Sequence, residues 1–311
     1  MAARADALTT TEIVQRALRR KRTDAAGQVF QMLLLLGLLI SLLFLVVLLF
    51  DIISKAIPTF QERGSDVVTA TVSSLPERAG VSQGISGSLL LVAFVVVIAF
   101  PLGIGAAVYL EEYAPDTRLN RFININVRNL AGVPSVVYGL LGLVLFVKLL
   151  GGVTGGRSVM SAGITLAILV LPIVIITSAE ALRAVPNSIR EAGYGVGATK
   201  WEVTRSHVLP SAAPGILTGT VLSLSRAIGE TAPLLMVGAV SGFFAVSADG
   251  LVERLQSQFT ALPVIVYNWS RLPDPGFREN LVPAAIVILL VLTLSANAIA
   301  ILLRNRYDRK W

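Results

Sequence analysis

Long apolar stretches, separated by shorter polar segments, make up most of the chain. A helix needs roughly 20 apolar residues to cross about 30 Å of hydrocarbon. Six stretches meet this requirement, and the fifth is the least uniform: Phe30–Ile53, Ser86–Leu110, Leu130–Leu150, Met160–Leu182, Gly215–Phe244 and Val282–Leu303. Their apolar residues run continuously and do not alternate, which indicates helices and not the strands of a membrane barrel. The pattern predicts an all-α integral membrane protein with six transmembrane helices.

The composition agrees with a bilayer environment. Of the 311 residues, 54% are hydrophobic and 14% are charged, whereas soluble domains carry roughly 25% charged residues. The absence of cysteine excludes disulfides, thiol nucleophiles and cysteine-ligated metals. The single histidine, His207, cannot form a His-rich metal site or proton relay. We therefore expect no catalytic residues and no metal site in this chain.

The basic residues predict an orientation in the membrane. Of the 26 Lys and Arg residues, 17 fall in the two tails, the second-to-third loop and the fourth-to-fifth loop. Seven fall in the other three loops, Lys148 lies near the end of the third stretch, and Arg226 lies within the fifth stretch. Because cytoplasmic loops carry the excess of Lys and Arg, both termini are predicted to be cytoplasmic. The net charge of +7 then reflects topology in a lipid bilayer and does not indicate a nucleic-acid partner.

The predicted organisation is a cytoplasmic tail over residues 1–29, a six-helix transmembrane domain over residues 30–303, and a basic cytoplasmic tail over residues 304–311. In the first tail, Thr9 and Glu12 have the spacing of a capping box. The helix that follows would have one apolar and one basic face, suited to the membrane surface. A disordered basic tail is the alternative.

Two outer segments, residues 54–85 and 245–281, are the longest polar stretches. The second contains Trp269 and a run from Pro273 to Gly276 that is rich in Pro and Gly. Such residues are typical of defined turns. We expect the second segment to be an ordered cap and not a linker.

Two charged residues interrupt the fifth stretch. A charged residue at the centre of a membrane helix costs about 2.5–3.5 kcal/mol on insertion scales. Arg226 and Glu230 are four residues apart, so they can share a helix face and pair, while Gly229 and Pro233 loosen the helix around them. Three hydroxyl side chains lie nearby: Ser223, Ser225 and Thr231.

Two interpretations of this cluster remain open. One is a buried clamp that only holds helices together. The other is a polar patch facing a solute pathway, which is the usual role of ionisable groups inside a membrane. A guanidinium is a fork of donors suited to an oxyanion such as phosphate. Arg226 could hold the anion, and Glu230 could hold Arg226 in the empty pathway or accept a hydrogen bond from a protonated phosphate oxygen.

The cytoplasmic segment Glu191–Pro210 is too polar to span the membrane, yet it carries regularly placed apolar residues. Glycines at 193, 195 and 197 predict short broken helices. The segment is either an ordinary amphipathic connector or a docking element for a cytoplasmic partner. It also lacks the GxxxxGK[ST] phosphate-binding loop and any preceding strand. If ATP drives this protein, another chain hydrolyses it.

This segment resembles the EAA signature of ABC-importer permeases, written EAA-x3-G-x9-I-x-L-P. Five residues match it, while Gly193 replaces the second Ala and His207 replaces Ile: Glu191, Ala192, Gly197, Leu209 and Pro210. The resemblance implies a type I ABC importer permease of MetI-like architecture. It also implies that the segment contains the coupling helix, with Glu191 and Gly197 in the ATPase contact.

Three further segments resemble the permeases of bacterial phosphate importers: RAIGETAPLL at Arg226–Leu235, AGVPSVVYGLLGL at Ala131–Leu143 and LPVIVYNW at Leu262–Trp269. The GETAPL sequence is nearer the PstA-type subunit than the PstC-type. The resemblance implies a bacterial inner-membrane subunit that transports phosphate with a PstC-type permease, a PstB-type ATPase dimer using ATP and Mg, and a PstS-type binding protein. No cofactor is expected on this chain.

Several alternatives stay open on the sequence. Within the same class, the chain could be the PstC-type partner or a permease for phosphonate, sulfate or molybdate. From other classes, an ion-gradient-driven anion transporter and a membrane partner that transports nothing are the rivals. The EAA-type segment argues against both, because neither needs a cytoplasmic ATPase.

Overall fold

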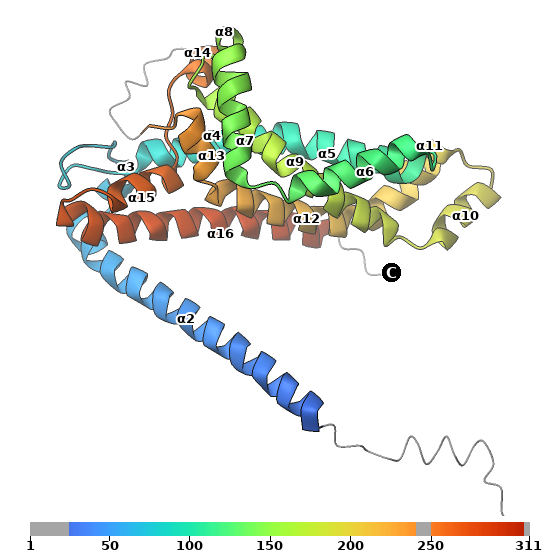
Figure 1. Ribbon diagram of the computed structural model, residues 1–311, viewed down its shortest axis with the longest axis horizontal. Helices are drawn as coiled ribbons and strands as arrows, with labels where there is room; N and C mark the ends of the chain where they lie inside the picture. The colour runs from blue at the N-terminus through green and yellow to red at the C-terminus, as the bar shows by residue number, and fades with distance from the viewer. Residues whose placement is uncertain (1–24, 241–249, 308–311) are drawn as a thin grey trace, which may run out of the picture. The chain divides into compact units, whose positions relative to one another are not determined.

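The computed structural model describes residues 25–240 and 250–307, and every regular element in these ranges is a helix (Figure 1). The tail helix predicted around Thr9 and Glu12 lies outside the described residues, as does the end of the basic tail after Tyr307. The chain divides into two compact units, residues 1–51 and 52–311.

Helix α2 (Ala25–Arg63) contains the first predicted span and extends beyond it at both ends. In the first unit, nearly all large apolar side chains from Val29 to Phe50 are exposed. An apolar surface of this length requires lipid or another protein around it. In the second unit, the end of α2 is anchored by the Thr59 hydroxyl, which donates to the carbonyl oxygen of Asn280 at 3.2 Å.

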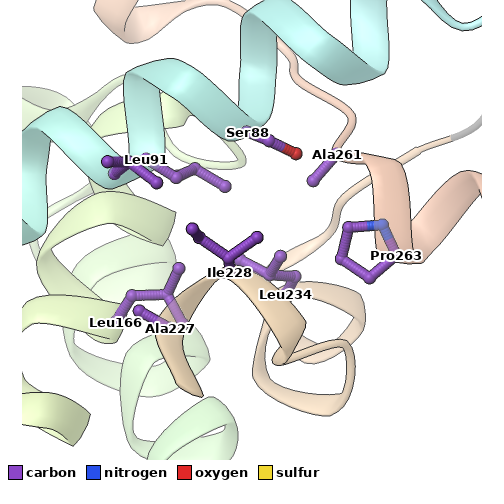
Figure 2. A pocket seen from close by; sticks show the side chains of 9 residues that line it. Ser88, Leu91, Leu166, Ala227, Ile228, Leu234, Ala261 and Pro263 are labelled. Atoms are coloured by element: carbon purple, nitrogen blue, oxygen red, sulfur yellow. The ribbon is translucent and has the colours of Figure 1, made fainter. Parts of the chain in front are cut away.

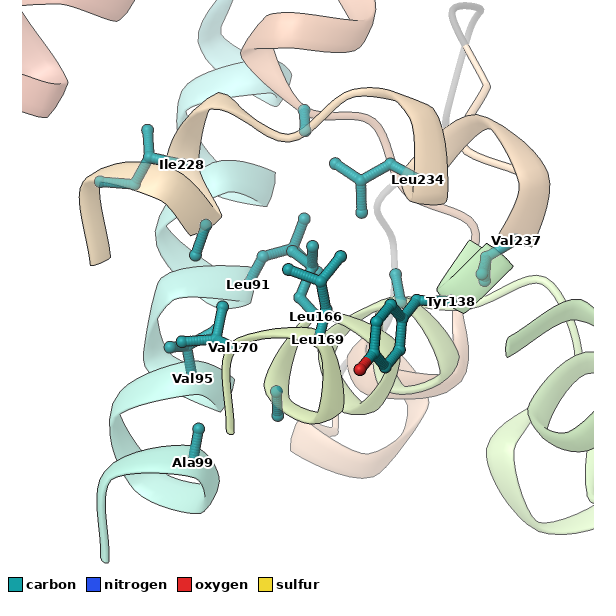
Figure 3. Packing of buried hydrophobic residues seen from close by; sticks show 14 of the residues in the cluster. Leu91, Val95, Ala99, Tyr138, Leu166, Leu169, Val170, Ile228, Leu234 and Val237 are labelled. Atoms are coloured by element: carbon teal, nitrogen blue, oxygen red, sulfur yellow. The ribbon is translucent and has the colours of Figure 1, made fainter. Parts of the chain in front are cut away.

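Helix α9 (Val159–Arg183) contains the fourth predicted span and forms the centre of the second unit. Its side chains belong to the largest group of buried apolar residues. Figure 3 shows Leu166 and Val170 of α9 beside Leu91 and Val95 of the second span. The core of the second unit is therefore built around this helix.

Small residues let neighbouring helices approach α9 closely. A Cβ atom on Gly219 would lie 2.3 Å from Thr177 Oγ1, and one on Gly103 would lie 2.7 Å from Val174 Cγ1. Lipid gives no hydrophobic force between helices, so membrane helices associate by this kind of close packing. These glycines set the distance between α9 and its neighbours.

Five helices are long and apolar enough to cross a membrane, and a bent pair gives a sixth, as predicted. The second and sixth spans are continuous helices that include π-helical segments. The second span consists of α4 (Ser82–Phe94), η1 (Val95–Ala99), α5 (Phe100–Val108) and η2 (Tyr109–Tyr113). The sixth consists of η5 (Gly276–Leu281) and α16 (Val282–Tyr307).

The third predicted span is not the straight helix expected over Leu130–Leu150. It is a pair bent by 101°. The pair consists of α6 (Arg118–Ala131), then α7 (Ser135–Gly142) with η3 (Leu143–Leu149). Pro134 causes the break, because a proline disfavours helical geometry in the residue before it. The prediction of one uninterrupted helix was wrong here.

The fifth predicted span is also broken. Helix α12 (Leu209–Gly229) ends where Glu230 turns to extended geometry, with ψ of 120°, and α13 (Ala232–Val237) follows. The loosening expected from Gly229 and Pro233 is confirmed, although the expected continuous helix to Phe244 is not. Residues 241–249 lie outside the described ranges.

The two outer segments contain three short helices in their described residues: α3 (Asp66–Thr69), α14 (Leu251–Gln256) and α15 (Leu262–Ser270). A fourth, α8 (Gly151–Thr154), lies between the third and fourth spans. The side chain of Trp269 is buried, and its ring centre lies 5.5 Å from that of Phe277. Over its described residues, 250–281, this second segment is ordered, as predicted.

Two of the segments singled out in the sequence, Ala131–Leu143 and Arg226–Leu235, lie against each other through α7 and α13. A Cβ atom on Gly139 would lie 2.7 Å from Pro233 Cα, and one on Gly142 would lie 3.0 Å from Val237 Cγ2. The close fit fixes the part of the chain that follows Glu230.

Replacing Gly139 with alanine tests this contact. The added methyl group would press on the backbone of Pro233, which cannot move aside as a flexible side chain can. We expect thermal unfolding of the purified chain in detergent to show a loss of about 1–3 kcal/mol. Gly105→Ala is the matched control, since a Cβ atom there meets nothing within 4 Å. Equal stability of the two variants would contradict the packing.

Candidate functional site

The ion pair predicted in the fifth span is present. Arg226 Nε lies 3.1 Å from Glu230 Oε1. Their spacing predicted that the two residues share a helix face. They do not, because the helix ends at Gly229 and Glu230 lies beyond it. The pair therefore depends on the break as much as on the spacing.

The described residues leave the Arg226 side of the ion pair partly uncovered. The side chain of Arg226 is 44% exposed and that of Glu230 is 15% exposed, while the neighbouring Ala227 and Ile228 are buried in the core. Counted from Gly215, where the predicted fifth stretch begins, Arg226 lies roughly 17 Å along the helix at a rise of about 1.5 Å per residue, which is about half the hydrocarbon thickness. At this depth the exposed charge needs water or a second protein beside it.

The three predicted hydroxyl residues do not form one cluster. Ser223 is buried and its hydroxyl donates to the carbonyl oxygen of Gly219 at 2.9 Å, so it faces the core and not the surface of Arg226. Its place beside the pathway stays a prediction. Thr231 is half-buried and starts α13 without a side-chain capping bond.

Ser225 has a partner that the sequence analysis missed. Its hydroxyl donates to Asn297 Oδ1 of α16 at 2.6 Å. The bond joins α12 to the sixth span one residue before Arg226. A signal was available, because Asn297 is an amide inside the apolar stretch Val282–Leu303.

A small cavity lies on the core side of the same helix. It holds about 10 Å³, roughly the space of one water molecule. Figure 2 shows mostly apolar side chains around it, among them Leu91, Ile228 and Leu234. Its one hydroxyl, on Ser88, accepts a hydrogen bond from the backbone N–H of Leu262 at 3.0 Å. This cavity is too small to hold an oxyanion such as phosphate.

The cytoplasmic segment is directly continuous with the helix that carries Arg226. It contains α10 (Asn187–Gly195), α11 (Lys200–Val203) and a π-helical turn, η4 (Thr204–Val208), before α12 begins. From Lys200 to Gly229 these elements form one unbroken helix. A single rod therefore joins the cytoplasmic segment to the ion pair.

The glycines of this segment have different roles. Gly197, with φ of +83°, makes the left-handed turn after α10, a geometry that side chains rarely adopt. Gly193 does not break a helix, contrary to expectation, and lies inside α10. A Cβ atom on Gly193 would lie 2.6 Å from Val203 Cγ2. This contact explains why glycine stands where the signature has alanine.

The residues assigned to ATPase coupling fall into two groups. Glu191, Ala192 and Gly197 are exposed together around α10 and its turn, whereas Leu209 and Pro210 lie at the start of α12. Large side chains are also exposed on the first group's surface: Tyr194, Val196 and Trp201. Val196 is 85% exposed. We refer to Tyr194, Val196 and Trp201 as the loop patch.

Comparison with known proteins gives the family. Residues 99–310 match the family described as "Binding-protein-dependent transport system inner membrane component". The phosphate transport system permease protein PstA of Yersinia pestis is 33% identical over 291 residues, which cover 91% of this chain and 92% of that protein. The probable ABC transporter permease protein YqgI of Bacillus subtilis is 30% identical over 174 residues, which cover 56% of this chain and 58% of that protein.

Two solved structures share the fold. A bacterial alginate ABC transporter aligns with a TM-score of 0.61 at 15% identity, over 86% of this chain and 92% of that chain. The MetNI methionine ABC transporter in an inward-facing conformation aligns with a TM-score of 0.58 at 18% identity, over 76% of this chain and 100% of that chain. The predicted type I importer architecture is confirmed. The chain belongs to the binding-protein-dependent transport system inner membrane components, which are multi-pass proteins of the bacterial inner membrane.

Proposed function

We propose that this chain is a PstA-type permease that forms half of the pathway of an ATP-driven phosphate importer. The observation that carries the proposal is the Arg226–Glu230 ion pair, in which the Arg226 side chain is 44% exposed, at the middle of the predicted fifth stretch. The sequence is 33% identical to the phosphate permease PstA of Yersinia pestis over 91% of this chain, which supports phosphate as the substrate.

In this proposal, Arg226 is the contact for phosphate in the pathway. Among the described residues, only its Nε atom has a hydrogen-bond partner, Glu230 Oε1. The two terminal nitrogens of the guanidinium are thus available to an oxyanion, which they match as a planar fork. Glu230 neutralises Arg226 when the pathway is empty. When phosphate is present, Glu230 accepts a hydrogen bond from a protonated oxygen, which sulfate lacks at neutral pH.

The family implies an ATPase and a substrate-binding protein as partners. We assign these to a PstB-type ATPase dimer and a PstS-type binding protein, with a PstC-type permease as the other half of the pathway. ATP and Mg belong to the ATPase, and this chain acts without a cofactor or catalytic site of its own. The second permease covers the face that carries Arg226.

The loop patch and Glu191 form the docking surface for the ATPase. The exposure of Tyr194, Val196 and Trp201 supports this role, since aromatic residues are enriched at protein interfaces and three large apolar side chains are exposed here within eight residues. The unbroken helix from Lys200 to Gly229 carries a movement of the docked loop to the Arg226–Glu230 pair.

Replacing Arg226 with alanine removes the proposed phosphate contact. A hydrogen bond to a charged group contributes about 1.5–3 kcal/mol, so uptake of radiolabelled phosphate into proteoliposomes should fall about tenfold or more. The complex should assemble normally. Arg278→Ala is the control, because Arg278 pairs with Glu279 at 3.6 Å in an outer segment where both side chains are more than half exposed. Failed assembly of the Arg226→Ala complex alone would identify a structural clamp instead.

Replacing Glu230 with glutamine tests the second residue of the pair. Glutamine keeps the shape but carries no charge and is a weaker acceptor for the protonated phosphate oxygen. We expect reduced phosphate uptake and a smaller preference for phosphate over sulfate, measured with both radiolabelled anions in the same vesicles. Unchanged uptake together with unchanged rejection of sulfate would exclude both roles of Glu230.

A single cysteine tests the docking surface, because the natural chain has none. The thiol of a Val196→Cys variant should react fast with a maleimide in the isolated chain and become protected, by about tenfold in rate, when the ATPase is bound. Val252→Cys is the control, since Val252 is exposed in an outer segment. Equal labelling of Val196→Cys with and without bound ATPase would contradict docking at the loop patch.

A further inference from the structure

A buried ion pair holds the cytoplasmic loop against the second span. Arg190 lies in α10 directly before Glu191, and Glu112 lies in η2, at the end of the second span. The Nη2 atom of Arg190 is 2.6 Å from Glu112 Oε1, and its Nε atom is 3.2 Å from the same oxygen. The two side chains are only 17% and 4% exposed.

Arg190 also binds the end of a third helix. Its Nη1 atom donates to the carbonyl oxygen of Val185 at 2.8 Å, and its Nη2 atom donates to that of Leu182 at 2.9 Å. These carbonyls belong to the last turn of α9 and the residues after it, where backbone acceptors carry partial negative charge. One guanidinium therefore ties α10, η2 and α9 together.

Only arginine has the donors for this arrangement. Its planar group directs five N–H bonds in fixed directions, while lysine offers one rotating ammonium. Arg190 uses its Nε, Nη1 and Nη2 atoms at once. Such a contact resists sliding and rotation of α10 against the second span, so a displacement of one is passed to the other.

A second ion pair, Arg183–Glu111, lies next to Glu112 in the chain but joins different elements. Arg183 Nε lies 2.7 Å from Glu111 Oε2, and 46% of the Arg183 side chain is exposed. Arg183 belongs to α9 and Glu111 to η2, so this pair joins two spans and does not involve α10. It provides a matched control one residue away from Glu112.

We propose that Arg190 and Glu112 form a clamp that transmits movement of the coupling loop to the second span. The coupling loop here means residues 187–203, from α10 to α11. The inference rests on the proposed docking of an ATPase at the loop patch. The loop would then move two spans together: the Arg226 helix, with which it is continuous, and the second span, which it holds through the clamp. At its outer end the second span contacts the start of α15, because the backbone N–H of Leu262 donates to the Ser88 hydroxyl. The clamp therefore extends the effect of the loop to that side. Arg190 and Glu112 are positioning residues and do not touch the substrate.

The test uses the reconstituted complex and measures phosphate transported per ATP hydrolysed. Glu112→Gln keeps the shape of the side chain and removes its charge, and Arg190→Lys keeps the charge and removes the fork. In both variants the ATPase should co-purify in normal amount while transport per ATP falls by about five- to tenfold. Glu111→Gln, the control, should stay within about twofold of the unaltered complex.

A distance measurement separates transmission from mere stability. Spin labels on Ser188→Cys in α10 and Tyr109→Cys in η2, both at exposed positions outside the loop patch, report on the coupling loop and the second span in an otherwise cysteine-free chain. With the clamp intact, their separation should be the same in the nucleotide-free and ATP-bound complexes. In the Glu112→Gln complex it should change on ATP binding.

Three results would overturn the clamp: unchanged transport per ATP in both variants, an effect of Glu111→Gln equal to that of Glu112→Gln, or loss of the co-purifying ATPase from the variants. The last result would mean that the pair shapes the docking surface and transmits nothing. Failure of the proposed function is distinguishable from all three, because the unaltered chain would then retain no ATPase at all.

Discussion

A guanidinium halfway across a bilayer cannot face hydrocarbon. Arg226 is exposed in this chain, and the helix break next to it adds a second demand, because non-helical backbone at membrane depth must be buried in protein or line a water-filled space. Charge and break fall at the same place, around Gly229 and Glu230. Both requirements are met if this face borders a pathway shared with another chain. The rest of the fold serves to hold this face in position.

Close packing does most of that holding. The glycine contacts of Gly219 and Gly103 fix α12 and α5 on α9, and Gly139 fixes α7 on α13. Because lipid supplies no hydrophobic force between helices, these contacts and a few hydrogen bonds determine where Arg226 lies. The Ser225–Asn297 bond adds a polar link to α16 directly beside it. The result is an ion pair held on a rigid wall, with its free side open.

The sequence predicted what depends on local pattern. Apolar runs predicted the spans, and the pairing of Arg226 with Glu230 followed from residues four apart. Local pattern marked the bend of the third span only through Pro134, and the apolar residues on both sides of it predicted a single helix. It also missed Asn297 and Glu112, whose partners are 72 and 78 residues away in the chain. The prediction that Gly193 breaks a helix was wrong for the same reason. Its role depends on close contact with Val203, which lies across a turn of the chain.

Arginine–glutamate pairs recur in this chain, and their surroundings decide what each can do. Arg190 has every nitrogen bound, to Glu112 and to two carbonyl oxygens, so an incoming anion has no free donor to bind. Arg226 has one bond to Glu230 among the described residues and a side chain nearly half exposed, so an oxyanion can approach without breaking the pair first. Arg278 and Glu279 are both more than half exposed to solvent, where an ion pair contributes little. The same two residue types thus fit a rigid connection, an exchangeable binding contact and a surface pair, and the difference lies in how many donors each environment has already used.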